Sequence, residues 1–146
     1  MSDYTQFLRS KIDLATETGF DISPDDINPV LFGHDKDAVT WAIKGGKRAL
    51  FEAFGLHKTI QQLEICRIIT EHKGGKALIV LPLGVKQEFT HDAIEVLGWE
   101  TGPEYVRNMA EVEASTNPIL MTNYERVRDG DIDPTYFKVT SLDEAA

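Results

Sequence analysis

The chain has 146 residues, of which 42% are hydrophobic, so its length and composition fit one globular domain and exclude a disordered chain. Its 15 basic and 24 acidic residues give a formal net charge of −9. This charge argues against binding nucleic acid alone, because such binding depends largely on neutralising phosphates, and it suits a protein that docks on a basic surface. No apolar run approaches the length of a membrane span and no secretory signal is visible, so we expect a cytoplasmic protein without membrane contact.

Helices and strands are predicted to alternate along the chain. Apolar residues at helical spacing predict helices near residues 7–14, 35–44, 59–72, 85–97 and 124–128. Short apolar runs bounded by turn residues predict strands at 48–54, 77–81, 104–106, 119–122 and 137–142. This alternation predicts an α/β fold of three layers, with a mostly parallel sheet and helices on both faces, in a single domain spanning residues 1–146. Residues 1–30 are expected to form an N-terminal helix and loop.

The segment from Gly55 to Thr59 reads Gly-Leu-His-Lys-Thr, between a predicted strand and a predicted helix. It matches a phosphate-binding loop except at His57, where the usual residue is glycine. In such a loop Lys58 would bind the phosphates and the Thr59 hydroxyl would bind Mg²⁺. Glycine lets the backbone approach phosphates closely, so we expect His57 to impair nucleotide binding.

The last predicted strand is followed by Asp143 and Glu144. In ATPases an acidic pair at the end of a strand holds Mg²⁺ and the attacking water. The phosphate-binding loop pattern at Lys58 strengthens this interpretation of the pair. Without that loop, an acidic tail would be the simpler explanation. Asp143 and Thr59 are therefore the candidate Mg²⁺ ligands, needed only if nucleotide binds.

Together these stretches resemble the first RecA-like lobe of a superfamily-two helicase, of the Swi/Snf type common in phages and prophages. The resemblance covers roughly residues 25–145. Residues 31–39 are similar to the adenine-recognition segment of the family, residues 54–59 to motif I and residues 81–89 to motif Ia. Residues 120–125 are similar to the end of the strand before motif II, and residues 141–145 to motif II itself. It implies that residues 31–146 form a partial helicase lobe of the phosphate-loop NTPase type. It also implies that Lys86 and Gln87 descend from a DNA-contacting loop.

The departures from the family indicate lost activity. Asp35 stands where the family has the glutamine that recognises adenine, and a carboxylate can accept hydrogen bonds but cannot donate them. His57 replaces the loop glycine, and the sequence ends two residues after Glu144, so the second lobe with its arginine finger is missing. We therefore expect a pseudo-ATPase with a vestigial site and no resident cofactor, encoded by a naturally short reading frame.

Two functions follow from this resemblance. The first is a non-catalytic phage protein that acts by protein–protein interaction, as an anti-CRISPR-type inhibitor or decoy of a host defence or helicase-containing complex. A protein partner or a homodimer would then cover the surface left by the missing strands. The alternative is an ATP-binding half of a DNA translocase that uses Mg²⁺-ATP and obtains its second lobe from another chain. A decayed remnant without function is a third, weaker reading.

Overall fold

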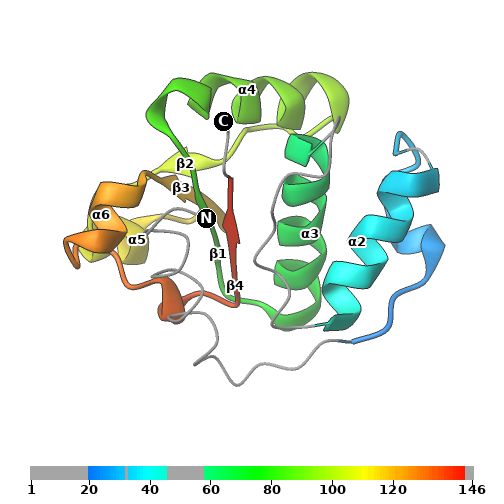
Figure 1. Cartoon of the computed structure of the whole chain (residues 1–146), viewed down its shortest axis with the longest axis horizontal. Coiled ribbons are helices and arrows are strands. Elements are labelled where there is room, and N and C mark those ends of the chain that lie inside the picture. Colours follow the sequence, from blue (N-terminus) through cyan, green and yellow to red (C-terminus); the bar gives the residue numbers. More distant parts are fainter. Residues whose placement is uncertain (1–19, 32, 46–57, 144–146) are drawn as a thin grey trace.

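The computed structural model describes residues 20–31, 33–45 and 58–143. Its sheet has four strands, β1 (Ala77–Val80), β2 (Glu104–Tyr105), β3 (Ile119–Thr122) and β4 (Val139–Leu142). They lie in the order β2-β3-β1-β4, and every pairing is parallel (Figure 1). The predicted parallel sheet is therefore confirmed for the described strands.

The register of the sheet places the carboxyl ends of three strands at one edge. Val80, the last residue of β1, lies opposite Thr122 of β3 and Leu142 of β4. The pairing continues one residue further, because the Asp143 amide donates to the Val80 carbonyl at 2.8 Å. Ligand sites of open parallel sheets lie outside the carboxyl edge, so a functional site is expected at this edge.

The helices follow the apolar patterns closely. The described helices are α2 (Gly33–Gly45), α3 (Lys58–Lys73), α4 (Lys86–His91), α5 (Met109–Ala114) and α6 (Tyr124–Arg128). The helix α4 continues as the π-helical turn η4 (Asp92–Val96), and short 3-10 turns lie at η1 (Pro24–Asp26), η3 (Leu83–Val85) and η5 (Pro134–Tyr136). Each of these α-helices except α5 was predicted, and the last strand begins at Val139, two residues later than expected.

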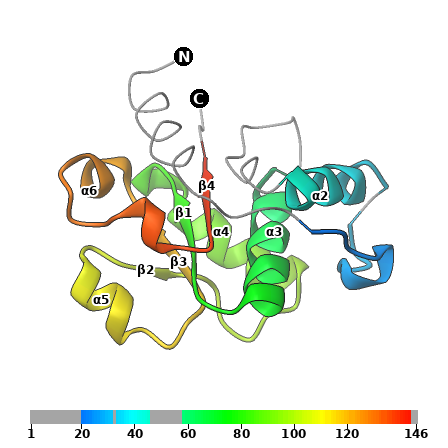
Figure 2. The same cartoon turned by 90° about the horizontal axis from the view of Figure 1, so that it is seen from below.

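Two apolar cores, one on each face of the sheet, give the fold its three layers. Alternate residues of a strand point to opposite faces, so Ile79 joins a core with α2, α3 and α4, whereas Leu78 and Val80 join a core with α5 and α6. Helices α2 and α3 accordingly lie on one side of the sheet and α5 and α6 on the other (Figures 1 and 2). Among the described residues no helix is long and apolar enough to cross a membrane.

Helix α3 is buried on nearly all sides because it lies between the sheet and α2 (Figure 1). The predicted burial of this helix is confirmed, but its buried residues include polar side chains, namely Gln61, Gln62 and Glu64. A buried polar group needs a hydrogen-bonding partner to offset its lost hydration. The partners of these three residues connect α3 to the rest of the molecule.

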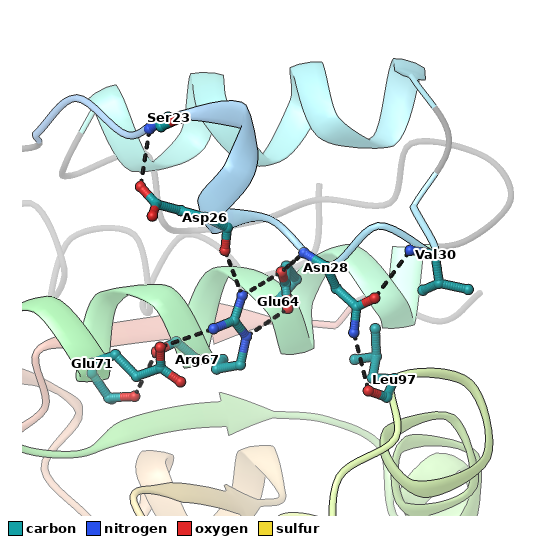
Figure 3. Close-up of polar contacts among 9 residues, drawn as sticks. Ser23, Asp26, Asn28, Val30, Glu64, Arg67, Glu71 and Leu97 are labelled. Atoms are coloured by element: carbon teal, nitrogen blue, oxygen red, sulfur yellow. Dashed lines mark hydrogen bonds and ion pairs between the residues drawn. The ribbon is translucent and has the colours of Figure 1, made fainter.

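Glu64 connects α3 to the segment that precedes α2 (Figure 3). Its carboxylate accepts hydrogen bonds from the Asn28 amide at 2.5 Å and from Arg67 at 2.6 and 2.9 Å. Arg67 also donates to the Asp26 carbonyl at 2.8 Å, and the Asn28 side chain donates to the Leu97 carbonyl at 3.0 Å. This cluster attaches Asp26 and Asn28 to α3.

Candidate functional site

Lys58 and Asp143 lie side by side at the carboxyl edge of the sheet. Lys58 is the first residue of α3, and Asp143 follows the last residue of β4. The Lys58 Nζ atom is 3.7 Å from Asp143 Oδ1, with the Asp143 side chain only 2% exposed and that of Lys58 27% exposed. The fold thus brings together a cation from the start of a helix and a carboxylate from the end of a parallel strand.

A cavity opens beside Asp143 at the same edge. Its volume is about 180 Å³, and its lining consists of the ends of β1 and β4 and the start of α6: Val80, Leu81, Pro82, Tyr124, Glu125, Leu142 and Asp143. Thr59, the second residue of α3, is 8% exposed. The groups that the structure brings together at this corner are the Lys58 ammonium and the Asp143 carboxylate, which in general can interact with a phosphate and with a divalent cation respectively.

The Asp143 carboxylate is also held from the inside of the protein. Gln62 donates from Nε2 to Asp143 Oδ1 at 3.2 Å, and its Oε1 accepts from the Ser141 hydroxyl at 2.7 Å. All three side chains are at most 2% exposed. Sequence reasoning missed Gln62 and Ser141. The available signal was spacing, because Gln62 lies four residues after Lys58 and therefore on the same face of α3.

Asp35, in helix α2, is buried against α3. Its side chain is 2% exposed, and its Oδ1 accepts from Gln61 Nε2 at 2.5 Å and lies 3.4 Å from His34 Nε2. The carboxylate of Asp35 therefore takes part in the packing of α2 against α3. Asp35 and Asp143 are held by adjacent glutamines of one helix, but no described contact joins Asp35 to Lys58.

Lys86 and Gln87 begin α4, which follows the carboxyl end of β1. The Lys86 Nζ atom lies 4.4 Å from the centre of the Tyr105 ring, a cation–π contact, and Gln87 is exposed. The Tyr105 hydroxyl donates to Asn123 Oδ1 at 2.5 Å. The structure therefore shows Lys86 in contact with Tyr105 of the edge strand β2, a contact that sequence reasoning did not anticipate.

Several predicted features lie outside the described residues. They are Gly55, His57 and Glu144, together with the strand predicted at 48–54 and the N-terminal helix. The described share of the predicted nucleotide site consists of Asp35, Lys58, Thr59 and Asp143.

Several carboxylates are exposed along residues 100–113, the segment that includes the edge strand β2. Glu100, Glu104 and Glu113 are exposed, and an open cavity of about 550 Å³ lies between β2 and α5. Arg107 contributes the opposing charge, since its guanidinium lies 2.8 Å from Glu111 and, by hydrogen bonding, lowers the pKa of that carboxyl. The segment 100–113 is therefore acidic, and Arg107 neutralises one of its carboxylates, that of Glu111.

A scan against protein-family models and a search of curated proteins both find no match for this chain.

Proposed function

We propose that this chain is a helicase-derived protein of phage origin that has no catalytic activity and acts by binding another protein. The observation that carries the proposal is the position of Asp35. The family resemblance puts this residue where adenine is recognised, yet its carboxylate is 2% exposed and bonded to Gln61. A carboxylate that is buried and already hydrogen-bonded within the fold is poorly placed to form hydrogen bonds with adenine.

The exposed carboxylates of residues 100–113 support the second half of the proposal. A net charge of −9 and exposed carboxylates at Glu100, Glu104 and Glu113 favour encounter with a basic protein surface. A host defence complex or a helicase-containing complex is the kind of partner that an inhibitor or decoy derived from a helicase would meet. A homodimer is the alternative partner.

The second candidate function is a nucleotide-binding half of an ATP-dependent translocase. The ion pair between Lys58 and Asp143 favours it, because these are the groups that would hold the phosphates and Mg²⁺. In this candidate the Lys58–Asp143 corner binds Mg²⁺-ATP, and another chain supplies the second lobe.

Calorimetric titration with Mg²⁺-ATP separates the two candidates. The parent chain is expected to bind weakly or not at all, with a dissociation constant above about 1 mM. His57→Gly alone and combined with Asp35→Gln are the test variants, and we expect binding to return in the double variant. Adding Lys58→Ala to the double variant is the matched control and is expected to abolish that binding.

Micromolar binding by the parent chain would overturn the non-catalytic proposal in favour of the second candidate. Partner binding is tested separately, by affinity capture from cells that carry defence systems. The comparison bait is a variant in which Glu100, Glu104 and Glu113 are changed to glutamine. A partner that binds both baits equally would contradict the role given to these three carboxylates.

A further inference from the structure

The side chain of Gln62 connects Asp143 of the candidate site to the buried strand residue Ser141. It is 1% exposed, and both ends of its amide are hydrogen-bonded, Nε2 to Asp143 and Oε1 to Ser141. The amide orientation follows from chemistry, since a carboxylate only accepts hydrogen bonds and a hydroxyl can donate one to the amide oxygen. Gln62 is therefore held in one orientation by a strand residue that is itself fully buried.

The consequence for Asp143 is a fixed direction of its carboxylate. The atom that accepts from Gln62 is Oδ1, and this same oxygen is the one that lies 3.7 Å from Lys58 Nζ. A carboxylate following the last described residue of β4 could otherwise rotate about its side-chain bonds. The bond from Gln62 leaves it facing the start of α3, where Lys58 stands.

We propose that Gln62 is a positioning residue that aligns Asp143 with Lys58, through the chain Ser141–Gln62–Asp143. Gln62 itself touches neither the cavity nor solvent among the described contacts, so it acts through Asp143. The alignment does not depend on nucleotide. The positioning role of Gln62 bears on the second candidate function only, because in that function the aligned pair would bind a phosphate and its Mg²⁺.

The neighbouring glutamine provides a matched control. Gln61 is also 1% exposed and also donates to a buried carboxylate, but its partner is Asp35 at 2.5 Å. Gln61→Met and Gln62→Met thus remove the same kind of bond from adjacent positions of one helix. General damage to α3 would appear in both variants, whereas loss of alignment would appear in Gln62→Met alone.

The test is nitrogen-15 NMR of the Lys58 ammonium group in the full chain, assigned with Lys58→Ala. An ammonium held by a carboxylate exchanges its protons with water slowly, so its signal is sharp. We expect Gln62→Met to accelerate this exchange about tenfold, the scale set by losing one hydrogen bond to a charged group, while Gln61→Met leaves it unchanged. Ser141→Ala, a smaller change, is expected to accelerate it partly and serves if Gln62→Met does not fold.

Unchanged Lys58 exchange in folded Gln62→Met, or in Ser141→Ala where Gln62→Met does not fold, would overturn the inference, as would equal acceleration in Gln61→Met. The nucleotide titration described above is a separate measurement. If Gln62→Met alters Lys58 exchange while no variant binds Mg²⁺-ATP, the positioning role stands and the second candidate function fails.

Discussion

The Glu64 carboxylate has no exposed surface and accepts two hydrogen bonds from the Arg67 guanidinium, one turn further along α3. The pairing is bidentate, a geometry that makes an arginine–carboxylate bond strong and directional. Hydrogen bonding to Glu64 is also the main cause of the raised pKa of Arg67, so this guanidinium stays charged throughout the accessible pH range. The pair joins α3 to residues 23–31 and is the basis of the first prediction.

Arg67→Met is expected to destabilise the protein by about 3–5 kcal/mol, because it leaves the buried Glu64 carboxylate without its counter-charge. Glu71 provides the control, since it contacts Arg67 from the surface with its side chain 60% exposed. Glu71→Gln is expected to cost less than about 1 kcal/mol. Urea denaturation of both variants measures the difference. Equal losses of unfolding free energy in the two variants would contradict the contribution assigned to the Glu64–Arg67 pair.

The buried thiol of Cys66 is expected to make the protein less stable at alkaline pH. Burial raises the pKa of its thiol from 9.0 to about 12, so above pH 9 the unfolded chain releases a proton that the folded chain keeps. Stability therefore falls as pH rises through this range, by about 1.4 kcal/mol between pH 8 and pH 10 for this one group. Cys66→Ala lacks the titrating thiol, so the free energy of unfolding of the parent minus that of the variant should decrease by this amount.

The same burial makes Cys66 unreactive in the folded protein. A thiol-specific reagent at pH 8 should modify Cys66 only after unfolding, because the reactive form is the thiolate. Rapid modification of the native protein, with its circular dichroism unchanged, would contradict the buried position.

Gly102 predicts a steric effect of a single methyl group. A Cβ atom at this position would lie 2.9 Å from both Cα and Cγ2 of Thr90, on the helix α4. Gly102→Ala is therefore expected to cost about 1–3 kcal/mol, since either the backbone or Thr90 must shift. At Gly84 a Cβ would meet nothing within 4 Å, so thermal denaturation of Gly84→Ala should show a change below about 0.5 kcal/mol.

Asn108 is expected to control the stability of α5. Its Oδ1 accepts a hydrogen bond from the Glu111 amide at 2.9 Å and so caps the first turn. Asn108→Ala should cost about 1 kcal/mol, whereas Asn108→Asp keeps an acceptor and should cost little. Equal unfolding free energies for the two variants would show that the cap contributes nothing.

The distribution of apolar residues predicted most of the described fold, because those of α3 recur at helical spacing and those of β1 form a short continuous run. It missed α5, whose six residues are too few for a clear period. The signal for α5 was its cap: Asn108 is followed three residues later by Glu111, whose carboxylate accepts from the Arg107 amide at 2.8 Å. Local hydrogen bonding, rather than an apolar face, marks this helix.

The sequence predicted the site residues whose type indicates their chemistry. It could not predict those whose role depends on burial and on contacts between distant segments. Lys58 and Asp143 were expected to serve one site, and the fold places them 3.7 Å apart. The burial of Asp35 could not be predicted, because it depends on where α2 packs on α3. Gln62 likewise owes its importance to Ser141 and Asp143, which are distant in sequence.

The strand order has a consequence for how the chain reaches its folded state. Strand β1 pairs with β3 on one side and with β4 on the other, and β4 is the last described strand along the chain. A chain made from its N-terminus therefore exposes both edges of the apolar strand β1 until its partners have been synthesised. Since parallel pairing between distant segments is slow, the newly made protein passes through a period in which β1 can pair with other chains, and aggregation competes with folding during that period.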